Sequence, residues 1–125
     1  MSSLGALKEI LLNRKLARLG DSYVNFVYSL ALTKTMNEPA GCKVSDSHLA
    51  EAARRTCVRG MLPKRTCRAD VANAVEALLV HSWLNKVISL DETVNVIMKN
   101  TRNPPEAFID LINEVMRRLG VEAPQ

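Results

Sequence analysis

The sequence is poor in aromatic residues and has no long hydrophobic run. It contains one Trp, two Tyr and two Phe, so aliphatic side chains must form most of any core. A membrane-spanning helix needs about 20 consecutive apolar residues, and no run approaches that length. Glu9 also comes too early for a secretory signal peptide. We therefore expect a cytoplasmic protein without a membrane partner.

The cysteines are few and loosely spaced. Cys42, Cys57 and Cys67 are an odd number, and no two of them form a C-x-x-C pair. This spacing argues against a disulfide framework and against a structural zinc site. We expect free thiols in a reducing compartment and no disulfide partner.

Acidic residues are missing between Glu51 and Asp70, although the whole chain carries a net charge of only +4. Six basic residues occupy this stretch: Arg54, Arg55, Arg59, Lys64, Arg65 and Arg68. Such a cluster could neutralise several phosphates of a nucleic acid. It could equally be a solvated helix end followed by a loop.

The hydrophobic pattern is helical almost throughout, and no alternating strand pattern lasts more than a few residues. It predicts an all-α protein of six or seven helices that forms a single domain over residues 1–125. A Ser45 or Asp46 cap, the capping box Ser-Leu-Asp-Glu and the Asn-Pro-Pro-Glu start signal mark three helix beginnings. The expected helices cover about 4–12, 14–36, 48–58, 68–86, 90–99 and 104–119.

Gly20 and Asp21 interrupt an apolar stripe in the second expected helix. Glycine in a helix interior costs about 1 kcal/mol relative to alanine. One interpretation is a helix break, with Gly20 ending one helix and Asp21 or Ser22 capping the next. The other is a continuous helix in which Asp21 has a functional role, because the apolar stripe crosses the junction without changing phase.

Asp70, Asn73 and Glu76 follow one another at a spacing of three in the fourth expected helix. They lie within an arc of about 120°. A solvated face explains the first two, but Glu76 borders the apolar residues Val75 and Leu79. Oxygen ligands from two helices could hold Mg²⁺, which would activate water against a phosphodiester.

Three segments resemble the endonuclease domain of the ribonuclease III family. "LARLGDSYVNFVYSLALT" resembles its signature helix, "SDSHLAEAARR" resembles the helix that follows, and "NAVEALLVHSWL" matches a later helix without a gap. The resemblance covers a motif-bearing core of about residues 14–86, followed by C-terminal helices over about 89–119. It implies a helical bundle similar to that of small archaeal members and of mini-ribonuclease III.

The resemblance also implies site residues. Asp21 and Glu76 fall on magnesium ligands, whereas the family's intervening aspartate falls on Asn73. Two glutamates that precede the Gly-Asp pair fall on Arg14 and Ala17. These departures thin the metal site, which would take Mg²⁺ or Mn²⁺. Independently of the family, helix geometry suggests that Asp70, one turn before Asn73, supplies the missing carboxylate.

The family further implies a homodimer that binds double-stranded RNA. Small residues at Ala17, Gly20 and Ser22 would suit close contact between signature helices across the dimer axis. We expect the protein to lack the family's usual double-stranded RNA-binding domain, so the six basic residues are the expected RNA contacts. A-form RNA is recognised mainly through its backbone and 2′-hydroxyl groups.

Three functions stay open from the sequence. The first is a Mg²⁺-dependent endoribonuclease, a phosphodiester hydrolase in which Asp21, Glu76, Asp70 and Asn73 are catalytic. The second is a degenerate member of the family that binds RNA or a ribonucleoprotein without cutting. The third is a small helical DNA-binding or regulatory protein. We also expect Trp83 to fill the core and Asn25 either to orient Asp21, to bond across the dimer axis, or to be a satisfied core polar group.

Overall fold

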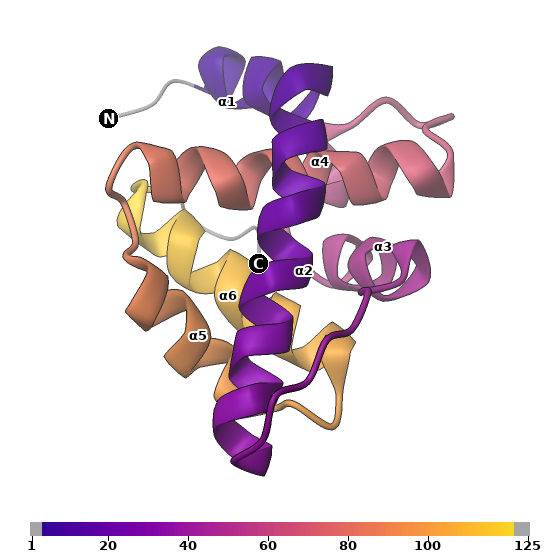
Figure 1. The fold of residues 1–125 in the computed structure, drawn as a ribbon. Helices are drawn as coiled ribbons and strands as arrows, with labels where there is room; N and C mark the ends of the chain where they lie inside the picture. The colour runs from indigo at the N-terminus through magenta and orange to yellow at the C-terminus, as the bar shows by residue number, and fades with distance from the viewer. Residues whose placement is uncertain (1–3, 122–125) are drawn as a thin grey trace.

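The computed structural model describes residues 4–121, which form six α-helices and one short 3-10 helix, with no strand among them (Figure 1). The predicted all-α fold is confirmed. The elements are α1 Leu4–Leu11, α2 Arg14–Met36, α3 Asp46–Arg54, η1 Arg59–Met61, α4 Arg68–Leu84, α5 Leu90–Met98 and α6 Pro104–Arg118.

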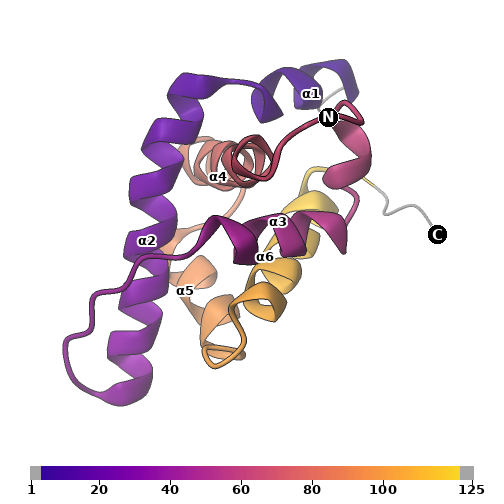
Figure 2. The same cartoon turned by 90° about the vertical axis from the view of Figure 1, so that its right-hand side faces the viewer.

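Helix α4 is the centre of the fold. Ten of its 17 residues are buried, and they lie on all sides of the helix. A helix that is apolar all round is a core helix, which the sequence "ADVANAVEALLV" already indicates. In Figure 1 the long α2 crosses α4 at a steep angle, and α1 lies beside their junction. Figure 2 shows α4 nearly end on, with α2 on one side and α3 below it.

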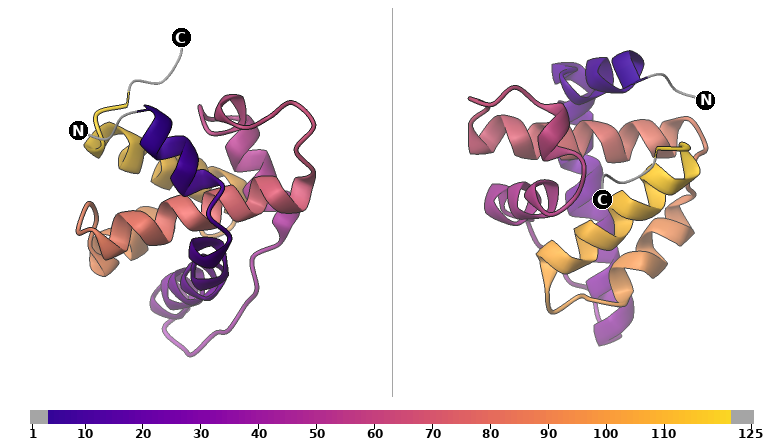
Figure 3. Two further views of the ribbon diagram at one scale, coloured as in Figure 1. Left: turned by 90° about the horizontal axis from the view of Figure 1, so that it is seen from above. Right: turned by 180° about the vertical axis from the view of Figure 1, so that it is seen from behind.

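Helices α5 and α6 close the opposite side of the core. Phe108 and Ile112 of α6 and Ile97 of α5 are fully buried, and they pack in the same cluster as Val24 of α2 and Leu78 of α4. Figure 3 shows α6 running beside α5 on the face away from the beginning of α2. The C-terminal helices therefore complete the core that holds α2 and α4 in place.

The helix starts follow the predicted capping signals. Ser45 caps α3, Ser89 with Glu92 forms the capping box of α5, and Asn103 caps α6. Asn13 caps α2, which the sequence analysis did not predict. The end of α3 was predicted too late, because the helix stops at Arg54 instead of about residue 58. The hydroxyl of Thr56 donates a 3.1 Å hydrogen bond to the Ala53 carbonyl, and a turn leads into η1.

Helix α2 runs unbroken from Arg14 to Met36, as expected, so the continuous helix is the correct one of the two interpretations at Gly20 and Asp21. Gly20 is buried, and its missing β-carbon leaves room for the backbone of α4 at Glu76. Ala17 is also buried on this side of α2. These two small residues therefore serve contact between α2 and α4 within one chain, contrary to the expected dimer contact. Ser22 is exposed and stays available for one.

The prediction that Trp83 fills the core is wrong as well. Its side chain is 38% exposed and stacks on Tyr23, with 5.3 Å between the ring centroids. Trp83 lies in the last turn of α4, where the neighbouring helices cover only one face. The Tyr23 hydroxyl continues inward and donates a 3.1 Å hydrogen bond to Thr93 of α5.

None of the helices within residues 4–121 is both long and apolar enough to cross a membrane. Cys42 and Cys67 are exposed, Cys57 is buried, and all three are free thiols.

Candidate active site

Asp21 and Glu76 meet where α2 crosses α4. Gly20 makes this crossing close, because the α4 backbone at Glu76 occupies the space in which a β-carbon would lie. The next residue, Asp21, is exposed at the edge of the crossing. Glu76 is on the facing turn of α4 and is only 4% exposed. The two acids that the sequence pattern paired are therefore neighbours.

The electrostatics of Glu76 reflect this position. Burial, a hydrogen bond with Asp21 and the negative charges of Asp21 and Asp46 raise its pKa from the usual 4.5 to about 8, against a smaller lowering by Lys43. A hydrogen bond between two carboxyl groups requires that one of them carries a proton. The Glu76 carboxyl is thus a buried acid that lacks enough positive charge to stay ionised at neutral pH.

Asp46 is a functional candidate that the sequence analysis did not assign. It is the first residue of α3, and the sequence suggested only a capping role for it. The cap is Ser45, whose hydroxyl accepts a hydrogen bond from the His48 amide. Asp46 is left exposed and contributes negative charge at Glu76. Nothing in its spacing from Asp21 or Glu76 could have indicated this.

These acids line an open hollow of about 380 Å³. Its walls come from α2, the connector before α3, α3 itself and α4. The lining residues are Arg14, Ala17, Arg18, Asp21, Lys43, Asp46, Asn73 and Glu76. The hollow thus combines carboxylate and amide oxygens with three cationic side chains.

Asn25 fixes Asp21 from the next turn of α2. Its amide nitrogen donates a 3.3 Å hydrogen bond to Asp21, and its carbonyl oxygen accepts a 2.7 Å hydrogen bond from the Val44 amide. This geometry matches the expected orienting role. It also ties the connector that carries Lys43 to α2.

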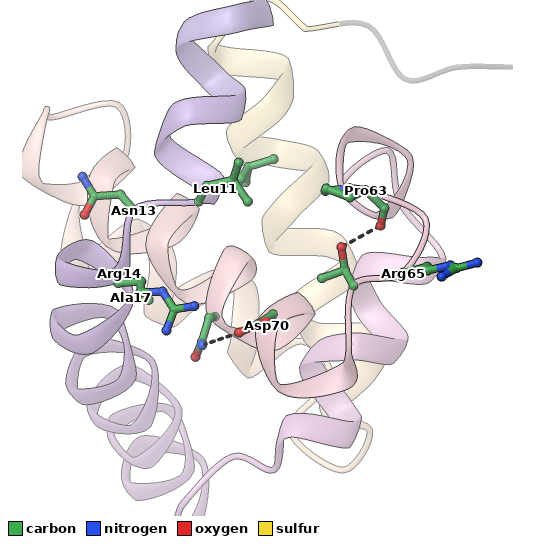
Figure 4. A pocket seen from close by; sticks show the side chains of 10 residues that line it. Leu11, Asn13, Arg14, Ala17, Pro63, Arg65 and Asp70 are labelled. Atoms are coloured by element: carbon green, nitrogen blue, oxygen red, sulfur yellow. Dashed lines mark hydrogen bonds between the residues drawn. The ribbon is translucent and has the colours of Figure 1, made fainter.

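Asp70 lies elsewhere. It does not line the hollow of Asp21 and Glu76 but a neighbouring pocket, where it accepts a 3.5 Å hydrogen bond from Asn73 (Figure 4). Asn73 lines both spaces. Of the four predicted site residues, the structure therefore gathers Asp21, Asn73 and Glu76 and sets Asp70 apart.

The ligand chemistry suits a hard divalent cation. Carboxylate and amide oxygens are what Mg²⁺ binds, usually together with several water molecules. The specific observation that fits a cation at this place is that the buried carboxyl of Glu76 has too little positive charge around it. Within residues 4–121, no three His, Cys, Asp or Glu side chains form a ready-made metal cluster. Any ion here would therefore rely on Asn73 or on water for part of its shell.

The predicted RNA-binding cations divide into two groups. Arg54 pairs with Glu51, and Arg55 pairs with Glu106 at 3.2 Å. The Arg59 guanidinium donates hydrogen bonds to the carbonyls of Pro63 and Lys64, at 3.2 and 2.9 Å. Because these three are occupied, they are poorer candidates for phosphate contacts.

The other group consists of Lys64, Arg65 and Arg68. All three are exposed, and their side chains have no hydrogen-bond or ion-pair partner within the described part of the chain. Arg68 lines a further open hollow with Lys43, between the beginnings of α3 and α4. Arg68 is the first residue of α4, and Lys64 and Arg65 lie in the connector before it. Because helix N-termini favour anions, a phosphate near this end of α4 would be stabilised.

Two comparisons with known proteins bear on the family of the chain. A search of curated proteins gives no significant match. A model of the family described as ribonuclease III matches residues 14–121, which covers the signature segments, the hollow and the C-terminal helices. The chain belongs to the ribonuclease III family.

Proposed function

We propose that the protein is a Mg²⁺-dependent endoribonuclease that cleaves structured or double-stranded RNA as a homodimer. The observation that carries this proposal is the pairing of Asp21 with the buried carboxyl of Glu76 at the α2–α4 crossing. Membership of the ribonuclease III family supports an RNA-directed nuclease in general. The metal, the oligomeric state and the competence of the site are our own inferences.

Asp21 and Glu76 would hold Mg²⁺ or Mn²⁺, with Asn73 or water completing the shell. When bound, such an ion lowers the pKa of water and neutralises charge on the phosphate and the leaving oxygen. The protein contributes the position of the two carboxyl groups, which Asn25 and the close helix crossing fix. Lys43 offsets part of the negative charge of the hollow.

Substrate binding would depend on cations around the hollow. Arg14, Arg18 and Lys43 line it, and Lys64, Arg65 and Arg68 extend the positive surface beside it. These residues suit the phosphates of A-form RNA, which proteins recognise by shape and backbone contacts. The three free thiols are consistent with our proposal of a cytoplasmic location.

Exposed apolar residues on α2 support a homodimer. Leu19 and Phe26 are 46% and 56% exposed, and they lie on one face of the helix with Ser22 between them. Residues seven apart return to almost the same side of an α-helix. Phe26 and Leu19 would pack against the same residues of a second copy about a two-fold axis.

The departures at Arg14, Ala17 and Asn73 favour one alternative. At these positions the resemblance implies carboxylates, whereas this chain has a guanidinium, a methyl group and an amide, so its hollow would bind a metal ion less strongly. A degenerate protein that binds RNA or a ribonucleoprotein without cutting it is therefore the second candidate function. DNA binding by a regulatory protein is the third, and it rests only on charge and helicity.

A cleavage assay on end-labelled duplex RNA with Mg²⁺ separates these functions. The nuclease proposal expects cleavage by the wild type and a loss of about a hundredfold or more in Asp21→Asn and Glu76→Gln. Asp91→Asn is the matched control, since Asp91 is an exposed acid in the first turn of α5, away from the hollow. Circular dichroism checks that each variant keeps its helices.

Intact RNA binding without cleavage by the wild type would favour the degenerate alternative. Equal affinity for DNA and RNA duplexes would favour the third function. Activity that survives both substitutions would contradict our assignment of Asp21 and Glu76.

A further inference from the structure

A second pocket of about 320 Å³ opens beside the hollow of Asp21 and Glu76 (Figure 4). It lies between the end of α1, the beginning of α2, the 63–66 segment and the first turns of α4. Arg14, Ala17 and Asn73 line both spaces, so the two are contiguous. The full lining is Leu11, Leu12, Asn13, Arg14, Ala17, Pro63, Arg65, Thr66, Asp70 and Asn73.

Its surface combines an aliphatic part with a few polar groups. Leu12 and Pro63 are exposed apolar residues of the lining, and Asp70 lies on the α4 side of the pocket in Figure 4. Small-molecule sites have this character, and they begin at about 300 Å³. The size fits one mononucleotide unit and is too small for two.

The charges at the rim suit a phosphate-bearing ligand. Within the described residues, the side chains of Arg14 and Arg65 have no hydrogen-bond or ion-pair partner. Asp70 is the single acid among the ten lining residues. The pocket therefore has two free cations against one carboxylate, and the carboxylate keeps oxygen lone pairs beyond its weak 3.5 Å bond from Asn73.

We propose that this pocket binds one unpaired nucleotide of the RNA substrate, with its base against the exposed Leu12 and Pro63 and its phosphate near Arg14 and Arg65. Leu and Pro are side chains that pack against base faces in other nucleic-acid complexes. This inference rests on the proposed function, because the phosphate that follows the bound nucleotide would enter the neighbouring hollow. RNA with a bulged or looped nucleotide is then preferred to a perfect duplex.

Asp70 also defines which base is accepted. A carboxylate only accepts hydrogen bonds, and Asn73 already uses its amide nitrogen to donate to it. A base that offers an exocyclic amino group complements this acceptor, as cytosine does. Uracil presents a carbonyl oxygen at the same position, which Asp70 repels.

The first test uses cytidine 5′-monophosphate and uridine 5′-monophosphate as probes, without metal or cleavage. Titration followed by amide NMR should shift Leu11, Thr66 and Asn73 with the cytidine nucleotide, and its affinity should exceed that of the uridine nucleotide about tenfold. Asp70→Ala should abolish the difference. Asp91→Ala, which removes a first-turn acid from α5, should retain it. Absence of shifts around the pocket, or equal affinities in the wild type, would overturn the proposal.

The second test compares RNA duplexes with one bulged cytidine, one bulged uridine or no bulge by fluorescence anisotropy. The wild type should bind the cytidine bulge most tightly, and Asp70→Ala should bind all three alike. A preference that persists in Asp70→Ala would refute the role of this residue. Anisotropy measures binding and does not depend on cleavage. If the nuclease proposal alone is wrong, the protein will still distinguish the three RNAs in this test but will give no product in the cleavage assay. If the pocket proposal alone is wrong, the protein will cleave RNA but will bind the three RNAs with equal affinity.

Discussion

Gly20 and Glu76 approach so closely that a β-carbon on Gly20 would lie 2.2 Å from the Glu76 carbonyl oxygen. The obstacle is backbone, so a rotamer change cannot relieve it. The glycine that appears unfavourable in the sequence is therefore what allows the two acids to meet.

Gly20→Ala should consequently destabilise the protein despite the better helix propensity of alanine. The helices must separate, and overpacking of this kind costs about 1–3 kcal/mol or more. Urea denaturation measures the change in the free energy of unfolding. Gly5→Ala is the helical control, because nothing lies within 4 Å of its added β-carbon, and it should be neutral or stabilising by up to about 1 kcal/mol. Equal effects of the two substitutions would contradict the close crossing.

Glu76 should make the stability of the metal-free protein fall with rising pH. Its pKa is about 8 in the folded chain and near 4.5 when exposed, so the folded state holds more protons between these values. Stability then declines as pH rises from about 4.5 to 8, by an amount on the order of a few kcal/mol. Thermal unfolding in EDTA at several pH values measures this decline. Glu76→Gln should flatten the profile, and an unchanged slope would show that another group is responsible.

Asn25→Ala should weaken the site as well as the fold. The substitution leaves the Val44 amide without its 2.7 Å partner and frees the Asp21 side chain. We expect a loss of about 1–3 kcal/mol in unfolding free energy together with slower RNA cleavage. Asn95→Ala is the control, since Asn95 is exposed on α5. Unaltered cleavage in Asn25→Ala would remove the orienting role.

Phe26→Glu should convert a homodimer into a monomer. Light scattering should give twice the chain mass of 13.9 kDa for the wild type and a single chain mass for the variant. Met36→Glu is the control, because Met36 is similarly exposed at 53% but is turned about 80° away around α2. A monomeric wild type would refute the proposed dimer.

Arg118→Met should cost more stability than Arg117→Met. Arg118 donates to Glu114 of its own helix at 2.7 Å, to Glu92 of α5 at 2.6 Å and to the Val87 carbonyl at 3.1 Å. Among residues 4–121, Arg117 bonds only to Glu114. We expect the free energy of unfolding to fall by about 1–2 kcal/mol in the first variant and by less in the second, measured by denaturant unfolding. Equal losses would mean that the link between α5 and α6 contributes little.

Local signals in the sequence predicted what depends on local physics. Ser89 and Asn103 accept the hydrogen bonds that start α5 and α6, and their patterns are short enough to recognise directly. The continuity of α2 at Gly20 needed the position of Glu76, which is 56 residues away in the chain. Sequence alone left both alternatives open for this reason.

The candidate site was predictable in part on the same grounds. Asp21 and Glu76 followed from their motifs, whereas Asp46 entered the hollow only through the path of the connector before α3. The pairing of Arg54 with Glu51 is local, but that of Arg55 with Glu106 joins segments that no pattern connects. Trp83 was misplaced because the cover over a helix end depends on which distant helices reach it.

The Arg59 guanidinium holds the segment that carries Lys64 and Arg65, because it donates hydrogen bonds to the carbonyls of Pro63 and Lys64. The hydroxyl of Thr66 donates a further 2.6 Å bond to the same Pro63 carbonyl. A loop already held in shape gives up little conformational entropy when a ligand arrives. Arg59 would thus aid the proposed RNA binding indirectly, by holding Lys64 and Arg65 in fixed positions, and its truncation would weaken that binding without removing a direct contact.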